Sequence, residues 1–306
     1  MNGFITPIQE IKNENRNKIF IKREDLLPFS FGGNKARKAK LFFKDIKKKT
    51  CDTVVTYGSS SSNHCRVIAN MAKANGLKCV IISPEENFIE TINSRLIRML
   101  GAKIVTTPID SVAKTIEEVI EELRKDHAPY FIQGGGHGNL GTQAYVEAYQ
   151  EICQYEQENN IEFDYIFHAS GTGTTQAGLV AGRLIAKREK QKIVGISIAR
   201  ANPRGKQVIL DSLNDFFGDD KDYSADVTFL DDYICGGYGK YDNDILATVR
   251  RVFETEGIPL NTTYTGKAFR GMKKYIEREN ITDKNILFIN TGGSPLFFDD
   301  LKEFAK

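Results

Sequence analysis

The sequence predicts an α/β protein made of two units, each a mostly parallel open sheet covered by helices. Short apolar runs of strand type alternate along the chain with segments whose apolar residues recur every three or four positions. The connections between these segments are short, and a β-α-β order with short connections is typical of a parallel sheet with helices on both faces. The 306 residues are enough for two domains.

The first unit is expected within residues 52–150. Its clearest helix lies at 111–125, where Val112, Ile116, Val119 and Leu123 follow helical spacing. The other elements are short and end at polar or glycine residues. Strands are expected at 52–57, 78–82, 103–106 and 130–132, and further helices at 63–75 and 91–100.

The second unit is expected to combine residues 1–51 with residues 151–306, after a long helix from about 140 to 158. The stretch 211–222 reads as an irregular segment that covers a surface. Strands are expected at 19–23, 165–169, 192–198 and 285–290, and helices at 36–43, 177–187, 244–256 and 266–279.

The composition excludes several classes of protein. The 42 basic residues balance 40 acidic ones, which gives no general attraction to nucleic acid or to an anionic membrane. No apolar run approaches the roughly 18 residues of a membrane span, and the first residues lack the features of a signal peptide. The five cysteines are scattered and form no C-x-x-C pair, which favours buried, reduced thiols in a cytoplasmic protein.

Residues 170–178 (Ser-Gly-Thr-Gly-Thr-Thr-Gln-Ala-Gly) form the most informative motif. They join an apolar strand to a helix, and such a glycine turn directs backbone N–H groups and the helix dipole at one point. We expect a phosphate there. A nicotinamide dinucleotide remains an alternative guest, although Gln176 stands where the G-x-G-x-x-G motif requires its third glycine.

Four other segments carry candidate functional groups. Lys35 follows Gly32 and Gly33 at the start of a helix, whereas the other lysines of that stretch, including Lys38, read as a solvated face. The polar run 58–64 lies at the end of a strand, where open α/β sheets bind ligands. Two tyrosines stand in glycine-flanked turns, and the histidines show no metal-ligand spacing. The tyrosines are Tyr238 and Tyr264.

Taken together, these segments resemble the pyridoxal-phosphate enzymes of the tryptophan-synthase β-like fold (fold type II). Within them the chain is most similar to the family of D-cysteine desulfhydrase and 1-aminocyclopropane-1-carboxylate (ACC) deaminase. The resemblance extends from about residue 21 to residue 297, and the order and spacing of its motifs make it specific. The motifs are Ile-Lys-Arg-Glu-Asp-Leu (21–26), Phe-Gly-Gly-Asn-Lys-Ala-Arg-Lys (31–38), Ser-Asn-His (62–64), the glycine turn with Leu179 (171–179), Tyr-Thr-Gly-Lys-Ala (264–268) and Thr-Gly-Gly (291–293).

The resemblance implies the cofactor pyridoxal 5'-phosphate and a role for each motif. Lys35 matches the lysine that forms the Schiff base and then moves the α-proton, while Ser62, Tyr238 and Tyr264 match residues that face the substrate. Residues 1–51 with 151–306 would form the large cofactor-binding domain. The cofactor-binding residues implied are Lys35, Asn63, Gly171, Thr172, Gly173, Thr174, Thr175, Thr265 and Thr291.

Thr265 separates two reactions within this family. The ring-opening deaminases carry a glutamate at the matching position, near the pyridine nitrogen, where a carboxylate keeps the nitrogen protonated and strengthens the electron sink. A threonine cannot supply that charge, and a weaker sink suffices when a good leaving group departs. The resemblance therefore favours α,β-elimination on a small amino acid, with a 2-oxo acid and ammonia as products.

Several alternatives stay open from the sequence. They are ACC deamination, a β-replacement of the cysteine-synthase kind, a nicotinamide-dependent oxidoreductase and a non-catalytic relative. Ser59, Ser60 and Ser61 replace the glycine and the isoleucine–glutamine pair that the family usually has, which indicates a more polar substrate pocket. The resemblance also implies a homodimer, and nothing in the residues requires a metal.

Overall fold

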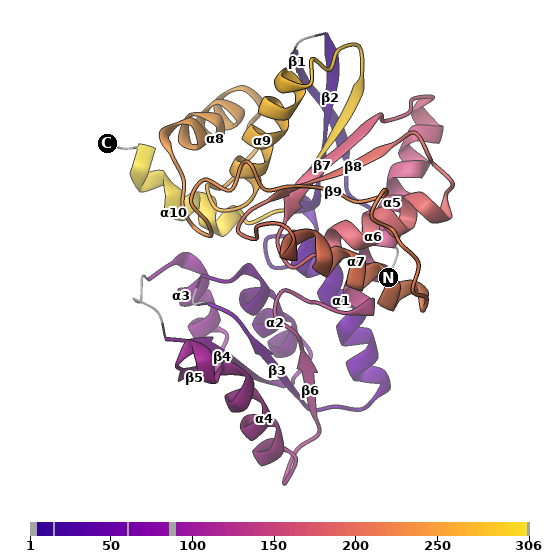
Figure 1. The fold of residues 1–306 in the computed structure, drawn as a ribbon. Helices are drawn as coiled ribbons and strands as arrows, with labels where there is room; N and C mark the ends of the chain where they lie inside the picture. The colour runs from indigo at the N-terminus through magenta and orange to yellow at the C-terminus, as the bar shows by residue number, and fades with distance from the viewer. Residues whose placement is uncertain (1–4, 15, 60, 86–89, 305–306) are drawn as a thin grey trace.

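The computed structural model describes residues 5–14, 16–59, 61–85 and 90–304, and these form two sheets with helices on their faces (Figure 1). Within these ranges the larger sheet has six strands in the order β1-β2-β10-β7-β8-β9. All neighbours pair in parallel except β1 and β2. The bounds are β1 Ile8–Glu14, β2 Asn17–Arg23, β7 Tyr165–Ser170, β8 Lys192–Ser197, β9 Thr228–Leu230 and β10 Asn285–Asn290.

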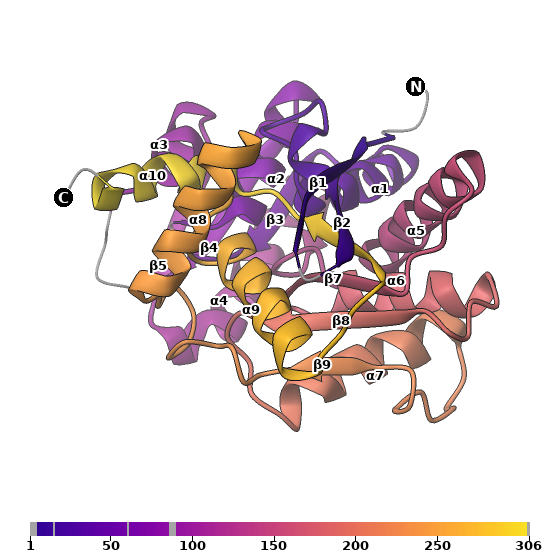
Figure 2. The ribbon, with the colours of Figure 1, turned by 90° about the horizontal axis from the view of Figure 1, so that it is seen from above.

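Helices cover both faces of this sheet because its strands are apolar on both sides (Figure 2). On one face lie α5 (Asn139–Asn159), α6 (Thr174–Ile185) and α7 (Arg204–Phe217); on the other lie α8 (Asn243–Glu256) and α9 (Thr265–Arg278). The axes of α5 and α6 approach closely at Gly178, where an added Cβ would overlap the carbonyl oxygen of Thr142. The last helix, α10 (Ser294–Phe304), contacts α3 (Ile92–Met99), a helix packed beside the smaller sheet.

The smaller sheet is parallel throughout and has the order β5-β4-β3-β6 in the described part of the chain. Its strands are β3 Thr53–Tyr57, β4 Lys78–Pro84, β5 Lys103–Thr107 and β6 Pro129–Ile132. Helices α1 (Asn34–Lys48) and α2 (Asn63–Ala74) pack on one face, and α4 (Val112–Leu123) packs on the other. Helix α3 (Ile92–Met99) packs beside α2, and the 3-10 turns Glu24–Leu26 and Ile109–Ser111 complete the elements.

The predicted α/β class with two helix-covered, mostly parallel sheets is confirmed. The prediction of an irregular segment at 211–222 is wrong in its first half, because helix α7 runs to Phe217. The division into residues 1–51 plus 151–306 and residues 52–150 stays a prediction; α1, from the first of these groups, shares a core cluster with β3 and α2.

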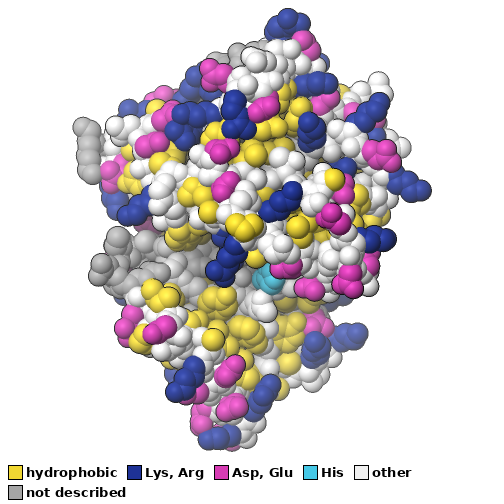
Figure 3. Space-filling view, in the orientation of Figure 1, with side chains coloured by type: hydrophobic (Ala, Val, Ile, Leu, Met, Phe, Trp, Pro, Cys, Tyr) yellow, Lys and Arg dark blue, Asp and Glu magenta, His cyan; other side chains and the backbone are white. Residues whose placement is uncertain are grey.

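The surface shows no segregation of charge on the face in Figure 3, where acidic and basic side chains are interspersed over both halves. None of the helices in the described ranges has the length and apolar character that crossing a membrane requires. In the same ranges, no three His, Cys, Asp or Glu side chains gather in a way that could hold a metal ion.

Candidate active site

A cavity of about 360 Å³ lies between the two sheets, at the carboxyl ends of their strands. The larger sheet contributes the segments after β2, β7, β8 and β10, and the smaller sheet those after β3 and β6. This edge is where open α/β sheets bind ligands. Of the residues predicted for the site, ten line the cavity: Lys35, Ser62, Asn63, Gly171, Thr172, Gly173, Thr175, Tyr238, Tyr264 and Thr291.

Lys35 is the second residue of α1 and reaches the cavity from there. The helix can begin against the end of β10 because Gly33 has no side chain: an added Cβ would lie 2.8 Å from the carbonyl oxygen of Thr291. Lys35 Nζ donates to the carbonyl of Gly135 at 2.8 Å. Burial lowers the pKa of Lys35 to about 8, so a much larger fraction of its amine is neutral near pH 7 than in a solvated lysine.

A buried ionic network fixes the start of α1. Glu24 accepts from Arg37 Nε at Oε2 (2.6 Å) and from Arg37 Nη2 at Oε1 (2.8 Å), and Lys22 Nζ lies 3.6 Å from the same Oε1. Burial by itself raises the pKa of Glu24, but the charges of Arg37 and Lys22 outweigh it and hold the pKa at about 2. The backbone carbonyl of Glu24 accepts from Gly33 N–H at 2.7 Å, which ties the network to the turn before Lys35.

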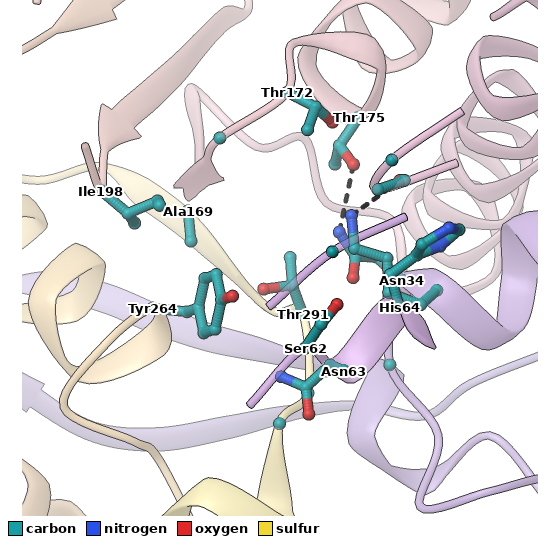
Figure 4. A pocket seen from close by; sticks show the side chains of 18 of the residues that line it. Asn34, Ser62, Asn63, His64, Ala169, Thr172, Thr175, Ile198, Tyr264 and Thr291 are labelled. Carbon is teal, nitrogen blue, oxygen red and sulfur yellow. Dashed lines mark hydrogen bonds between the residues drawn. The ribbon is translucent and has the colours of Figure 1, made fainter. Parts of the chain in front are cut away.

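The glycine turn after β7 leaves the first turn of α6 open to the cavity. Gly173 is the N-cap residue with φ of 97°, and no side chain caps the N–H groups of the helix. Thr175 Oγ1 accepts from Asn34 Nδ2 at 3.2 Å, which joins this turn to the start of α1 (Figure 4). An uncapped helix N-terminus in a glycine turn suits an anion.

Lys38 contacts the same turn through Thr174, outside the cavity lining. The prediction that it lies on a solvated face is wrong: its side chain is 1% exposed, and Nζ donates to Thr174 Oγ1 at 2.6 Å. Burial and then the charge of Lys35 lower its pKa well below the ordinary value. Thr174 is itself buried and does not line the cavity. The i, i+3 spacing from Lys35 is the sequence signal for a shared helix face.

Gln176 occupies the position where a dinucleotide motif has its third glycine. Its amide Nε2 donates to the carbonyl of Thr228 at 2.7 Å. The space for this side chain comes from β8, because an added Cβ on Gly195 would overlap the Gln176 amide. The close contact between helix and strand therefore uses a glycine on the strand instead of one on the helix.

Ser62 and Asn63 begin α2 at the other end of the cavity in Figure 4. Ser62 is the N-cap and accepts from Cys65 N–H at 3.2 Å. Asn63 Oδ1 accepts from Asn93 Nδ2 at 2.9 Å, and the same Asn93 group donates to Ser61 O at 2.7 Å. Asn93 is fully buried and thereby turns the Asn63 NH₂ group toward Gly293. No sequence pattern indicates this role of Asn93.

Tyr238 and Tyr264 meet across the cavity. Their hydroxyl oxygens are 2.5 Å apart, and the rings are edge-to-face at 5.8 Å. Burial, and then the neighbouring Tyr238, raise the pKa of Tyr264 well above its ordinary value. The loop of Tyr238 is held by Lys267, whose buried Nζ donates to Gly237 O at 2.8 Å and Ile198 O at 3.2 Å.

Thr265 does not line the cavity. It is fully buried, and its hydroxyl accepts from Asn261 N–H at 3.0 Å and Nδ2 at 3.1 Å. Thr291, from the end of β10, does present its side chain to the cavity. Within the described part of the chain no Asp or Glu lines the cavity, so no carboxylate of these residues faces a bound ligand.

Two further polar residues line the cavity walls. His64 is buried, with Nε2 2.8 Å from Thr56 Oγ1, and burial together with the charges of Lys35 and Lys38 lowers its pKa. Ser59 lines the wall, with its hydroxyl 3.3 Å from that of Ser61, whereas Ser60 lies outside the described residues.

The fold and this site define a pyridoxal-phosphate enzyme of fold type II. The chain belongs to the pyridoxal-phosphate dependent enzyme family, whose profile matches residues 2–292, and within it to the family of D-cysteine desulfhydrase and ACC deaminase. The cofactor is therefore pyridoxal phosphate, and this assignment favours the prediction from the resemblance over the nicotinamide alternative.

Three relatives illustrate the similarity. The D-cysteine desulfhydrase of Klebsiella pneumoniae (strain 342) is 32% identical over 92% of this chain and 88% of its own length. A Pyrococcus abyssi protein, provisionally named as a 1-aminocyclopropane-1-carboxylate deaminase, is 32% identical over 96% and 90%. The crystal structure of an ACC deaminase homologue superposes with a TM-score of 0.86, at 32% identity over 99% of this chain and 94% of that one.

The residues present fit this cofactor. A lysine with a lowered pKa and an uncapped helix N-terminus line one cavity, as an aldehyde and a phosphate on one molecule require. The backbone also leaves space beside the amine: an added Cβ on Gly135 would lie 3.3 Å from Lys35 Nζ.

Proposed function

We propose that this enzyme removes a β-substituent from a small amino acid by α,β-elimination. The Cα–H and Cβ–X bonds break, and the substituent X leaves with its bonding electrons. The released enamine reacts with water to give a 2-oxo acid and ammonia, so that amino acid and water become oxo acid, ammonia and HX. Bound pyridoxal phosphate supplies the electron sink for this chemistry.

The lining suggests a role for each side chain. Lys35 would hold the cofactor's aldehyde carbon and, once free, take the proton from Cα at Nζ. The turn 171–175 would hold the phosphate through its N–H groups, with Lys38 behind Thr174. Asn63 would donate its NH₂ group to the ring hydroxyl, in the orientation that Asn93 sets.

The remaining candidates would act on the substrate and on the ring. Ser62, which lines the cavity, would anchor a carboxylate or exchange a proton, and the hydroxyl pair of Tyr238 and Tyr264 would provide a second proton path. Thr291 is the better supported partner for the ring, because its side chain lines the cavity, whereas Thr265 is fully buried and does not line it.

The observation that carries the choice of reaction is the absence of any Asp or Glu from the described cavity lining. Without a carboxylate the pyridine nitrogen has no partner that keeps it protonated, and the cofactor is a weaker electron sink. A weak sink suffices when a good leaving group departs, which favours elimination over ring opening. Of the named relatives, the D-cysteine desulfhydrase of Klebsiella pneumoniae supports this choice.

The test is a comparison of substrates with the purified holoenzyme. D-cysteine, D- and L-β-chloroalanine and ACC are each supplied, and oxo acid and ammonia are measured. We expect turnover of at least one β-substituted amino acid and little of ACC; faster turnover of ACC than of every β-substituted amino acid would contradict the proposal. Lys35→Ala should abolish turnover, whereas Lys44→Ala, on an exposed position of the same helix, should not.

We propose in addition that the enzyme is a homodimer of the cytoplasm and that residues 52–150 form the smaller of its two domains. The support is the resemblance to the family and the pairing of β3–β6 into one sheet. Analytical ultracentrifugation gives the oligomeric state, and a monomer at micromolar concentration would contradict the dimer.

A further inference from the structure

The segment after β8 carries a cation that the chemistry above does not use. Ser197 ends the strand, and its hydroxyl donates to the carbonyl of Arg200 at 2.6 Å and accepts from Ala199 N–H at 3.3 Å. These two bonds fix a tight turn of the backbone. Arg200, at the end of that turn, is half-buried and lines the cavity.

One hydrogen bond also fixes the guanidinium of Arg200. Its Nη1 donates to the carbonyl of Gly171 at 2.9 Å, at the first residue of the glycine turn. A guanidinium has five N–H donors, so most of them stay available for another partner. Burial, and then the like charge of Arg204, lower the pKa of Arg200.

The other basic side chains beside the cavity also have hydrogen-bond partners in the protein. Lys38 donates to Thr174. Arg66 donates to the carbonyl of Ser30, and its guanidinium lies 5.5 Å from the ring centre of Phe31. Since no Asp or Glu of the described chain lines this cavity, Arg200 has no protein carboxylate to share it with. A half-buried charge in such a place is stabilised by an anionic ligand.

We propose that Arg200 binds an oxyanion in the active-site cavity, either the cofactor's phosphate or an acidic group on the β-carbon of the substrate. The two sources share one chemistry, since the planar guanidinium binds phosphate, sulfate and carboxylate groups through paired N–H bonds. In the second case the substrates are small amino acids with an anionic β-substituent, such as a phosphate or sulfate ester, which leaves with its bonding electrons in the elimination. The inference rests on the proposed function.

The test compares Arg200→Gln and Arg200→Lys with Arg204→Gln in the full-length enzyme. Arg204 is the matched control because it is exposed and lies outside the lining, four residues further on. The first measurement is the affinity of the apoenzyme for pyridoxal 5'-phosphate and for pyridoxal, which lacks the phosphate. The second is inhibition of turnover in the wild type and in each variant by phosphoserine and aspartate, each against its neutral counterpart, serine and asparagine.

We expect Arg200→Gln to weaken binding of the anionic member of one pair about tenfold or more, the size of a lost charge-assisted hydrogen bond. Arg200→Lys should lose less, and Arg204→Gln should change neither pair. A loss for pyridoxal 5'-phosphate but not pyridoxal assigns the anion to the cofactor; a loss for the acidic but not the neutral amino acids assigns it to the substrate.

Two results would overturn the inference: changes below twofold in both pairs, or equal losses for the charged and the neutral member of a pair. The proposed function fails in a different way, through a wild-type holoenzyme that turns over no amino acid. The cofactor-binding measurement stays informative in that event, because it needs no substrate.

Discussion

The burial of Lys35 predicts the pH range over which the apoenzyme takes up its cofactor. Exclusion of water lowers the pKa of this amine from 10.5 to about 8. At pH 7 such an amine is neutral in about 9% of molecules, against about 0.03% at the ordinary pKa, a gain of about 300-fold. Only the neutral amine adds to an aldehyde, so the gain applies directly to the rate of attachment.

The assay mixes apoenzyme with pyridoxal 5'-phosphate between pH 6 and pH 10.5 and follows the visible absorbance of the attached cofactor. A pKa near 8 gives a rate that rises about tenfold from pH 7 to pH 9 and is then level. An ordinary lysine gives a rise of about 100-fold over the same interval, and the rate continues to rise past pH 10. A rate that still increases above pH 9.5 would refute the argument from burial.

Three further variants test other parts of the structure. Asn93→Ala should weaken cofactor binding several-fold, because Asn63 loses the bond that orients its amide, and should lower the free energy of unfolding by about 2 kcal/mol. Asn75→Ala, which removes a bond at the end of α2, should leave cofactor affinity unchanged; equal affinity losses in both variants would show that the effect is not specific. Glu24→Gln should lower the free energy of unfolding by about 3 kcal/mol at pH 7, measured by urea unfolding, because it breaks a buried ion pair. The pKa of Glu24 is about 2 in the folded protein, below its ordinary 4.5, so this stabilisation is complete above pH 4.5 and is lost as the pH falls toward 2. The loss of unfolding free energy caused by Glu24→Gln should therefore be smaller at pH 3 than at pH 7. An equal loss at both pH values would contradict the ion pair. Gly178→Ala should lower the free energy of unfolding by about 1–3 kcal/mol through overlap with α5, and an unchanged melting temperature would contradict the close approach of the two helices.

Local signals predicted the glycine turn at 171–173 and the position of Lys35. Both depend on residues adjacent in sequence, where a turn and the helix after it decide which N–H groups and which amine are exposed. The strand order of the sheets could not be read in this way. It depends on which apolar faces pack together, which is a property of the whole chain.

The incorrect predictions for residues 211–217 and for Lys38 have particular physical causes. The sequence predicts an irregular stretch from residue 211 because residues 211–217 are rich in polar side chains, and only four residues of α7 are buried. The crowding of lysines in that stretch predicts a solvated Lys38, whereas packing against α5 and the glycine turn encloses its side chain. The hydrogen bonds of Asn93 and Thr265 join residues whose contacts depend on tertiary structure or on turn geometry.

The contact of α10 with α3 has a consequence for mutations remote from the chemistry. Asp299, on α10, accepts from Ile92 N–H with both carboxylate oxygens at 3.1 Å, and the next residue on α3 is Asn93. We therefore expect a displacement of α10 to move Ile92 and Asn93 and, through them, the amide of Asn63. Random mutagenesis with selection for altered turnover should recover substitutions in α10, although none of its described residues touches the cavity.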